Sequence, residues 1–199
     1  MIKVKNISHL GMVQAESHRQ SGNQVRIYTG DVATSAAPAV LHTLLGSCVA
    51  VCLYDPILHA GGMNHILLPG TRQNRFGTRF GIHAMELLIN ELMKQGGDRR
   101  RFIAKAFGGA NVMPGLRSSP IGDDNARFVS MFLERERIPL VAQRLGGSQA
   151  VHVYFRTDSG KAFLHTVDGS ELHKIIHAES AYRRQHLADR FQSGEITLF

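Results

Sequence analysis

Residues 44–70 read LLGSCVAVCLYDPILHAGGMNHILLPG, and this stretch decides the fold. Its first half is almost wholly apolar and stops at Asp55-Pro56, a dipeptide that signals a turn. Gly61-Gly62 then precedes a second short apolar run, which ends at Pro69-Gly70. The pattern predicts two buried strands, over residues 44–54 and 63–68, that pair as a hairpin.

The loop of this hairpin fixes which side chains face each other. If residues 55–58 form the loop, Tyr54 pairs with His59, and the same register places Cys48 directly opposite His65. Directly opposed residues have Cβ atoms about 4.5–5.5 Å apart, so a thiol and an imidazole come within hydrogen-bonding reach. An adjacent imidazole raises the thiolate fraction of a cysteine, which predicts a cysteine nucleophile with a histidine acid–base partner. A register shifted by one residue would abolish the pairing.

The competing interpretation is that both cysteines are structural. A cysteine in an apolar strand is more often a small buried hydrophobe, and this interpretation fits Cys52, which has no histidine in predicted opposition. On one extended strand the two Cα atoms are about 13 Å apart at about 3.3 Å per residue, beyond the roughly 7 Å limit for a disulfide. We therefore expect two free thiols. The cysteines and histidines match no zinc-ligand pattern, so no metal or cofactor is expected.

The rest of the chain predicts a layered arrangement of helices and strands. Apolar residues at helical spacing predict a helix over 80–95 that ends at Gly96-Gly97, and a second helix is expected over about 124–137. Further strands are predicted at 25–28, 102–107, 140–145, 150–156 and 161–167. The order favours an α/β (α+β) sandwich with mixed, largely antiparallel sheets. We expect a flexible leader at 1–24, one domain at 25–168, and a C-terminal helix with a short strand-like tail at 169–199.

Composition limits the classes of function. The 199 residues are 43% hydrophobic, enough for a buried core in one domain. The sequence has no run of about 18 apolar residues and no secretory segment, so we expect a cytoplasmic protein without membrane insertion. The net charge of +7 favours an acidic partner surface and fits a nucleic-acid binder equally well. Its densest basic run, at 99–101, lacks interleaved aromatic residues and a nucleic-acid motif, so we expect no nucleic-acid partner.

Residues 43–55 and 61–69 closely resemble the CheD family of chemoreceptor glutamine deamidases. The resemblance continues through residues 84–90 and through the glycine-rich turn at 107–111, and covers about 25–168. It implies an α/β sandwich related in its active-site arrangement to the cytotoxic necrotizing factor toxins. It also implies hydrolysis of glutamine side chains on methyl-accepting chemotaxis receptors, without a cofactor.

The resemblance assigns site residues one by one. The family's nucleophile falls on Cys48, and its histidine falls seventeen positions later on His65. The third catalytic residue of the family is a threonine shortly before the cysteine. Thr43, five positions upstream, is the candidate, while the position six upstream is His42. We interpret Ser47 as structural and the turn at 108–111 as a tight turn at the rim of the site.

Three functional hypotheses follow. In the first, Cys48 attacks a glutamine amide, a thioester forms, and His65 assists its hydrolysis to glutamate. In the second, the protein is a non-catalytic adaptor that binds receptors or a CheC-type phosphatase. The third is nucleic-acid binding, which would weaken steeply with salt.

Overall fold

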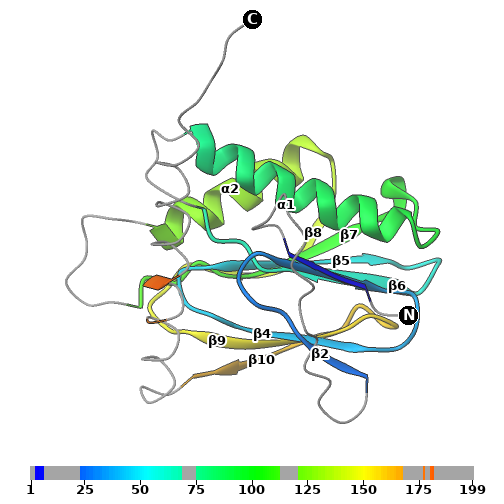
Figure 1. The fold of residues 1–199 in the computed structure, drawn as a ribbon, viewed down its shortest axis with the longest axis horizontal. Helices are drawn as coiled ribbons and strands as arrows, with labels where there is room; N and C mark the ends of the chain where they lie inside the picture. Colours follow the sequence, from blue (N-terminus) through cyan, green and yellow to red (C-terminus); the bar gives the residue numbers. More distant parts are fainter. Residues whose placement is uncertain are drawn as a thin grey trace, which may run out of the picture.

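The computed structural model describes residues 3–6, 23–68, 75–112 and 121–167, together with 177, 180 and 181. The described elements form three layers, with two helices over a six-stranded sheet and a four-stranded sheet beneath it (Figure 1). Apart from two parallel pairs, β7 with β8 and β2 with β4, neighbouring strands are antiparallel. The predicted layered α/β sandwich with mixed, largely antiparallel sheets is confirmed.

The two sheets divide the strands between them. The six-stranded sheet has the order β1 (Lys3–Asn6), β3 (Asp31–Ser35), β6 (Ala60–Asn64), β5 (Val49–Asp55), β7 (Ile103–Gly108) and β8 (Leu140–Leu145). The four-stranded sheet has the order β10 (Ala162–Thr166), β9 (Val151–Arg156), β4 (Val40–Leu45) and β2 (Gln24–Arg26). The helical layer consists of α1 (Arg75–Met93) and α2 (Ile121–Arg135), and the short 3-10 helix η1 (Arg99–Arg101) precedes β7.

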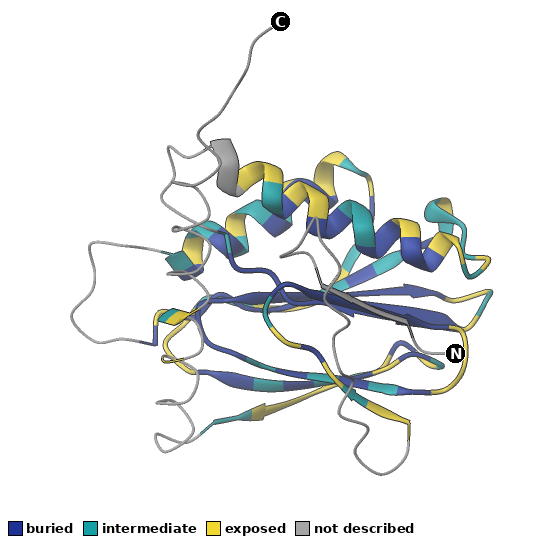
Figure 2. Ribbon diagram, in the orientation of Figure 1, coloured by how far each residue is buried: buried dark blue, intermediate teal, exposed yellow. Residues whose placement is uncertain are grey.

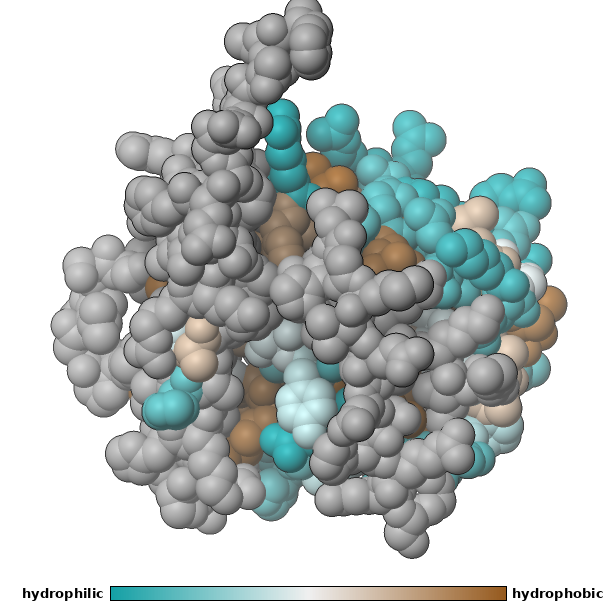
Figure 3. Space-filling model, viewed as in Figure 1, coloured by the Kyte–Doolittle hydropathy of each residue, from teal (hydrophilic) through white to brown (hydrophobic). Residues whose placement is uncertain are grey.

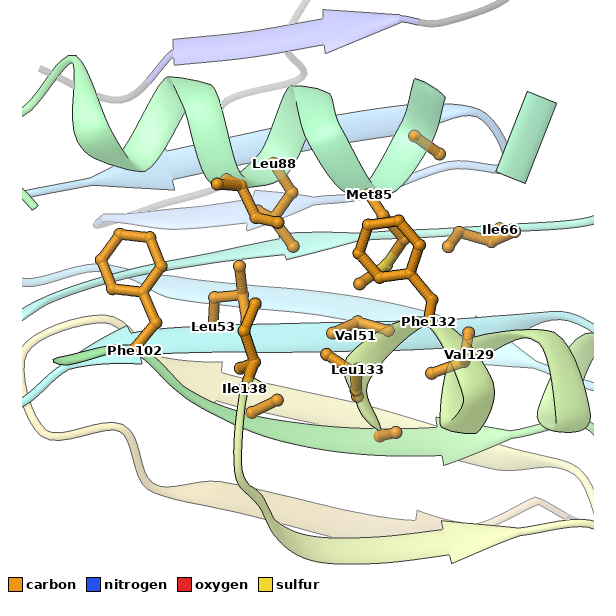
Figure 4. Packing of buried hydrophobic residues seen from close by; sticks show 14 of the residues in the cluster. Val51, Leu53, Ile66, Met85, Leu88, Phe102, Val129, Phe132, Leu133 and Ile138 are labelled. Atoms are coloured by element: carbon orange, nitrogen blue, oxygen red, sulfur yellow. The ribbon is translucent and has the colours of Figure 1, made fainter. Parts of the chain in front are cut away.

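Strand β5 runs through the middle of the molecule and is buried along its whole length (Figure 2). Because side chains alternate along a strand, Val51 and Leu53 pack against the helices (Figure 4), whereas Ala50 and Cys52 pack against the four-stranded sheet. The described residues therefore form a large buried core on each face of the central sheet. Figure 3 shows many hydrophilic residues over the helical layer, with some hydrophobic residues between them.

The single strand predicted over residues 44–54 is wrong. The chain forms β4 up to Leu45 and β5 from Val49, and these strands belong to different sheets. Residues 46–48 carry the chain from one sheet to the other. Because every residue from Leu45 to Asp55 is buried, the run continues across the break, and Gly46 is the local signal of it.

The predicted hairpin register is also wrong, by two residues. Tyr54 pairs with Gly61 and Asp55 with Ala60, so the loop is 56–59. The side chain of Asp55 accepts hydrogen bonds from the N–H groups of residues 57 and 58, and His59 adopts a left-handed φ of 54°. These contacts keep Asp55 in strand β5, so the loop begins at residue 56, one residue later than predicted. A shift of two residues leaves each side chain on the predicted face of the sheet, whereas a shift of one residue would move it to the opposite face.

The helices are confirmed with different bounds. Helix α1 begins five residues before the predicted position and ends at Met93. Gly96, at φ 101°, donates its N–H to the Met93 carbonyl, which gives the predicted glycine stop. Helix α2 begins at Ile121, about three residues early, and ends two residues before the predicted end.

The strand predicted over 63–68 is wrong in its bounds, because β6 covers Ala60–Asn64. Strands β2, β7, β9 and β10 begin and end within two residues of their predicted bounds, and β8 has the predicted bounds. Strands β1 and β3 were not predicted, and β1 lies inside the segment expected to be a flexible leader. The expected tail at 169–199 falls outside the described residues except for positions 177, 180 and 181. Within the described part of the chain, no helix has the length and apolar character needed to span a bilayer.

Candidate active site

Cys48 lies in the turn between the two sheets, and its side chain is fully buried. Backbone hydrogen bonds hold this turn on both sides. The Gly46 carbonyl accepts from the Ala110 N–H at 2.8 Å, and the Cys48 carbonyl accepts from the Gly109 N–H at 2.7 Å. The next residue, Val49, exchanges two hydrogen bonds with Ile66. The backbone that carries the thiol is therefore fixed by β7 and by the segment after His65.

The close approach of β7 to this turn requires glycine. Gly108 has φ 104°, and a Cβ there would lie 2.2 Å from the Cys48 carbonyl oxygen. Gly109 has φ 70°, and a Cβ there would lie 2.8 Å from the carbonyl oxygen of Gly122, in the first turn of α2. The glycine pair thus brings both β7 and α2 against the cysteine turn. This is the tight turn that the sequence predicted at the rim of the site.

His65 follows β6 and is held by its own backbone. Its N–H donates to the Asp31 carbonyl at 3.1 Å, and its carbonyl accepts from the Gly30 N–H at 2.9 Å. The ring lies on the side of the central sheet that faces β4, because its Nδ1 is 2.8 Å from the hydroxyl of Thr43. Cys48 packs in the core on that same side, so the face shared by the two residues is as predicted, although they are not directly opposed.

Thr43 determines which ring nitrogen of His65 carries the proton. The hydroxyl donates to the Ile27 carbonyl at 2.6 Å. Because a hydroxyl has one proton, its contact with Nδ1 requires that Nδ1–H donate to Thr43. The neutral ring therefore has its lone pair on Nε2. Burial lowers the pKa of His65 to about 4, against an opposing effect of the Ile27 carbonyl, so the ring is neutral at pH 7.

A second threonine, which sequence reasoning missed, meets the other ring nitrogen. The hydroxyl of Thr29 lies 3.3 Å from Nε2 of His65. Residues 28–31 form a turn in which the Asp31 N–H donates to the Tyr28 carbonyl, with Gly30 at φ 87°. The sequence signal for this turn is the pair Gly30-Asp31. Tyr28 beside it is half exposed and carries the Arg26 guanidinium over its ring.

Two other candidates lie elsewhere. His42 is on the outer face of the four-stranded sheet, where its Nδ1 is 3.2 Å from Nε2 of His152 and its ring stacks with that of Tyr154. It therefore lies on the opposite face of β4 from Thr43, whose hydroxyl contacts Nδ1 of His65. Cys52 is a buried core residue whose thiol pKa is raised by burial. Both cysteines are free thiols, as expected.

Asn125 is a further residue that the sequence did not single out. Its side chain is fully buried in the first turns of α2. The amide donates to the Ser47 carbonyl at 2.7 Å and accepts from the Leu68 N–H at 2.9 Å. One side chain thus joins the cysteine turn to the segment that follows His65. Among the described residues, no three His, Cys, Asp or Glu side chains are grouped as metal ligands.

The fold and the site together define a mixed α/β protein with a buried thiol and an oriented imidazole at the junction of two sheets. Residues 67–166 match a family model described as CheD chemotactic sensory transduction. That model matches half of the chain, and the chain belongs to the CheD family. The resemblance identified from the sequence is confirmed; the relation to the necrotizing factor toxins remains a prediction.

Individual relatives match a longer part of the chain. A protein of Stenotrophomonas maltophilia is 43% identical over 160 residues, which are 80% of this chain and 80% of that protein. A protein of Xanthomonas euvesicatoria is 44% identical over the same shares. One of Agrobacterium fabrum is 43% identical over 163 residues, 80% of this chain and 89% of its own length. Each is named as a probable chemoreceptor glutamine deamidase CheD.

Proposed function

We propose that this protein hydrolyses the side-chain amide of specific glutamines on chemoreceptors, giving glutamate and ammonia. Family membership and the names of relatives at 43–44% identity support the reaction and the substrate class. The observation that carries the proposal is the hydrogen-bonded series from the Ile27 carbonyl through Thr43 to Nδ1 of His65. This series orients a neutral imidazole with its lone pair on Nε2, which is what a general base requires.

The first half of the reaction forms a thioester. Nε2 of His65 takes the proton from the Cys48 thiol, and the thiolate attacks the amide carbon of the glutamine. The carbonyl oxygen becomes an oxyanion in the tetrahedral intermediate. When the C–N bond breaks, Nε2–H protonates the departing nitrogen, and ammonia leaves. Thr43 keeps the ring in one orientation throughout, as the third member of a triad.

The second half returns the enzyme to its starting state. A water molecule gives one proton to Nε2 of His65 while its oxygen attacks the thioester carbon. The C–S bond then breaks, and the thiolate recovers its proton from Nε2. The sum is one glutamine amide and one water converted to one glutamate and one ammonia, with no redox change and no cofactor. Because the Cys48 side chain is fully buried, a receptor glutamine reaches it only when the residues covering it move.

The partners and location follow from the same proposal. The substrates are methyl-accepting chemotaxis receptors, whose signalling helices lie in the cytoplasm, so the protein works there. The excess of basic residues, +7 overall, steers it towards acidic stretches of these helices. We also propose that a CheC-type phosphatase is a second partner. The adaptor hypothesis remains the alternative function, because receptor binding alone needs neither Cys48 nor His65.

The deciding experiment measures ammonia release and the mass of a purified receptor cytoplasmic fragment. Wild-type protein should add about 1 Da at each modified glutamine, because NH₂ is replaced by OH. Cys48→Ala and His65→Ala should add none, although both should still bind the fragment. Cys52→Ala is the matched control and should remain active. Binding without any mass change by wild-type protein would favour the adaptor; salt-sensitive binding to random DNA would favour the third hypothesis.

A further inference from the structure

Three consecutive carbonyl groups of the cysteine turn are held by donors from two places, the residues directly after β7 and helix α2. The Gly46 and Cys48 carbonyls accept backbone N–H groups, from Ala110 and Gly109. The middle carbonyl, that of Ser47, accepts from the side-chain amide of Asn125. A side chain can be changed without altering the backbone, so this middle contact can be tested by substitution.

The Ser47 carbonyl belongs to the peptide unit that carries the Cys48 N–H. The described residues contain no cis peptide bond, and in a trans peptide the C=O and N–H point in opposite directions. Fixing the carbonyl against Asn125 therefore directs the Cys48 N–H away from α2. The N–H of a nucleophilic residue is well placed to donate to an oxyanion that forms on the carbon attacked by its own side chain.

The packing of α2 explains why Asn125 reaches this carbonyl. A Cβ on Gly122 would lie 2.3 Å from the carbonyl oxygen of Gly109, so the first turn of α2 sits directly on the glycine pair. Asn125 is one helical turn further along and is fully buried. Its second hydrogen bond, from the Leu68 N–H, fixes the amide in one orientation, with Nδ2 towards Ser47.

We propose that Asn125 is a positioning residue that holds the Ser47–Cys48 peptide so that the Cys48 N–H stabilises the oxyanion of the deamidation reaction. The inference rests on the proposed function and adds a residue to it. Asn125 contacts neither the thiol nor the imidazole, and acts through the orientation of one peptide group. Its loss should slow steps that pass through a tetrahedral intermediate and spare reactions of the thiol that form no oxyanion.

Two reactions of the same cysteine separate this role from general loss of structure. Deamidation of the receptor fragment passes through an oxyanion, whereas alkylation of Cys48 by iodoacetamide is a direct displacement and does not. Loss of one oxyanion donor lowers kcat by about 100- to 1000-fold. Asn125→Asp keeps the size of the side chain but leaves the Cys48 N–H misdirected. This variant should therefore lower kcat by about 10- to 100-fold. The alkylation rate of Cys48 should stay within about threefold of wild type, and KM should change little.

Asn64 provides a matched control. It is also a fully buried asparagine that joins two elements, since it accepts from the Val51 N–H at 2.9 Å and donates to the Ala84 carbonyl at 3.3 Å. Asn64→Ala and Asn125→Ala remove the same atoms and should lower the midpoint of thermal unfolding by similar amounts. Only Asn125→Ala should lower kcat by tenfold or more, with both proteins assayed well below their midpoints. If Asn125→Asp does not fold, Asn125→Ala tests the inference in its place.

The outcomes are distinct. Equal kcat values for the Asn64 and Asn125 variants would overturn the inference. A parallel fall in alkylation and deamidation would also overturn it, because the amide would then support the thiol and not the oxyanion. If wild-type protein releases no ammonia, the proposed function fails and the inference fails with it. If Cys48→Ala abolishes activity while the Asn125 variants retain it, the inference alone fails.

Discussion

The hydroxyl of Thr43 lies 2.8 Å from Nδ1 of His65 and 2.6 Å from the carbonyl oxygen of Ile27. Thr43, in β4 of the four-stranded sheet, therefore supports the ring of His65, which follows β6 of the six-stranded sheet. It fixes the tautomer of His65 and leaves Nε2 as the nitrogen that exchanges protons. Each step of the proposed chemistry depends on that nitrogen.

Thr43→Val should lower kcat by about 10- to 100-fold, because general acid–base catalysis contributes about 10²–10⁴-fold and an unsupported ring loses part of it. The buried Ile27 carbonyl loses its donor, so the free energy of unfolding should fall by about 1–3 kcal/mol. Steady-state ammonia release and urea unfolding measure the two effects. Thr43→Ser keeps the hydroxyl and should recover most of the activity.

His42→Gln tests the other candidate for the third residue. The ring of His42 lies on the outer face of the four-stranded sheet against His152 and Tyr154. We therefore expect kcat within about threefold of wild type, because the substitution leaves the contact between Thr43 and His65 in place. A loss as large as that in Thr43→Val would transfer the role to position 42.

Stability should depend on pH through His65. Its pKa is lowered from about 6.5 to about 4 by burial, so between these values the unfolded chain binds more protons than the folded one. Stability is therefore complete above pH 6.5 and falls as the pH drops towards 4. At roughly 1.4 kcal/mol per pKa unit, the contribution is about 3 kcal/mol.

Urea unfolding of wild type and His65→Gln at pH 7.5, 6, 5 and 4.5 measures this contribution. The wild-type protein should lose stability relative to the variant as the pH falls through this series. If the free energy of unfolding changes equally with pH in the two proteins, the His65 ring is exposed to solvent and its pKa is not lowered by burial.

Gly108→Ala should destabilise the fold by more than about 2 kcal/mol, because a Cβ there would lie 2.2 Å from the Cys48 carbonyl oxygen and φ is 104°. Gly146→Ala is the matched control. It also has a positive φ, 78°, but no atom lies within 4 Å of its Cβ position, so its cost is that of the backbone alone, about 1–2 kcal/mol. Thermal unfolding of the two variants measures both losses of stability. The difference between them is the cost of the steric clash at residue 108, because both variants carry the strain of a positive φ.

The sequence predicted Cys48, His65 and Thr43 as a group, and the structure brings Thr43 and His65 into contact. The sequence pattern could not place the break between β4 and β5, because the chain is buried without interruption from Leu45 to Asp55. The register was wrong by two residues because the Asp55 side chain binds the loop N–H groups, a contact that a residue pattern does not reveal.

Asn125 and Thr29 were missed for a different reason. Each acts through hydrogen bonds to residues far away in the sequence. Asparagine in the first turns of a helix and threonine in a turn are both ordinary there, so neither position draws attention in a single sequence. Such contacts follow from tertiary packing, and local propensity does not predict them.

The two sheets contribute different parts of the site, and this has a consequence for partly unfolded forms. Thr43 belongs to the outer sheet, whereas the residues flanking Cys48 and His65 pair with the central one. A fluctuation that detaches the outer sheet would leave the helix-covered core intact yet separate the threonine from the imidazole. Chemistry would then stop before the protein melts, so that only a fully assembled molecule is competent to modify a receptor.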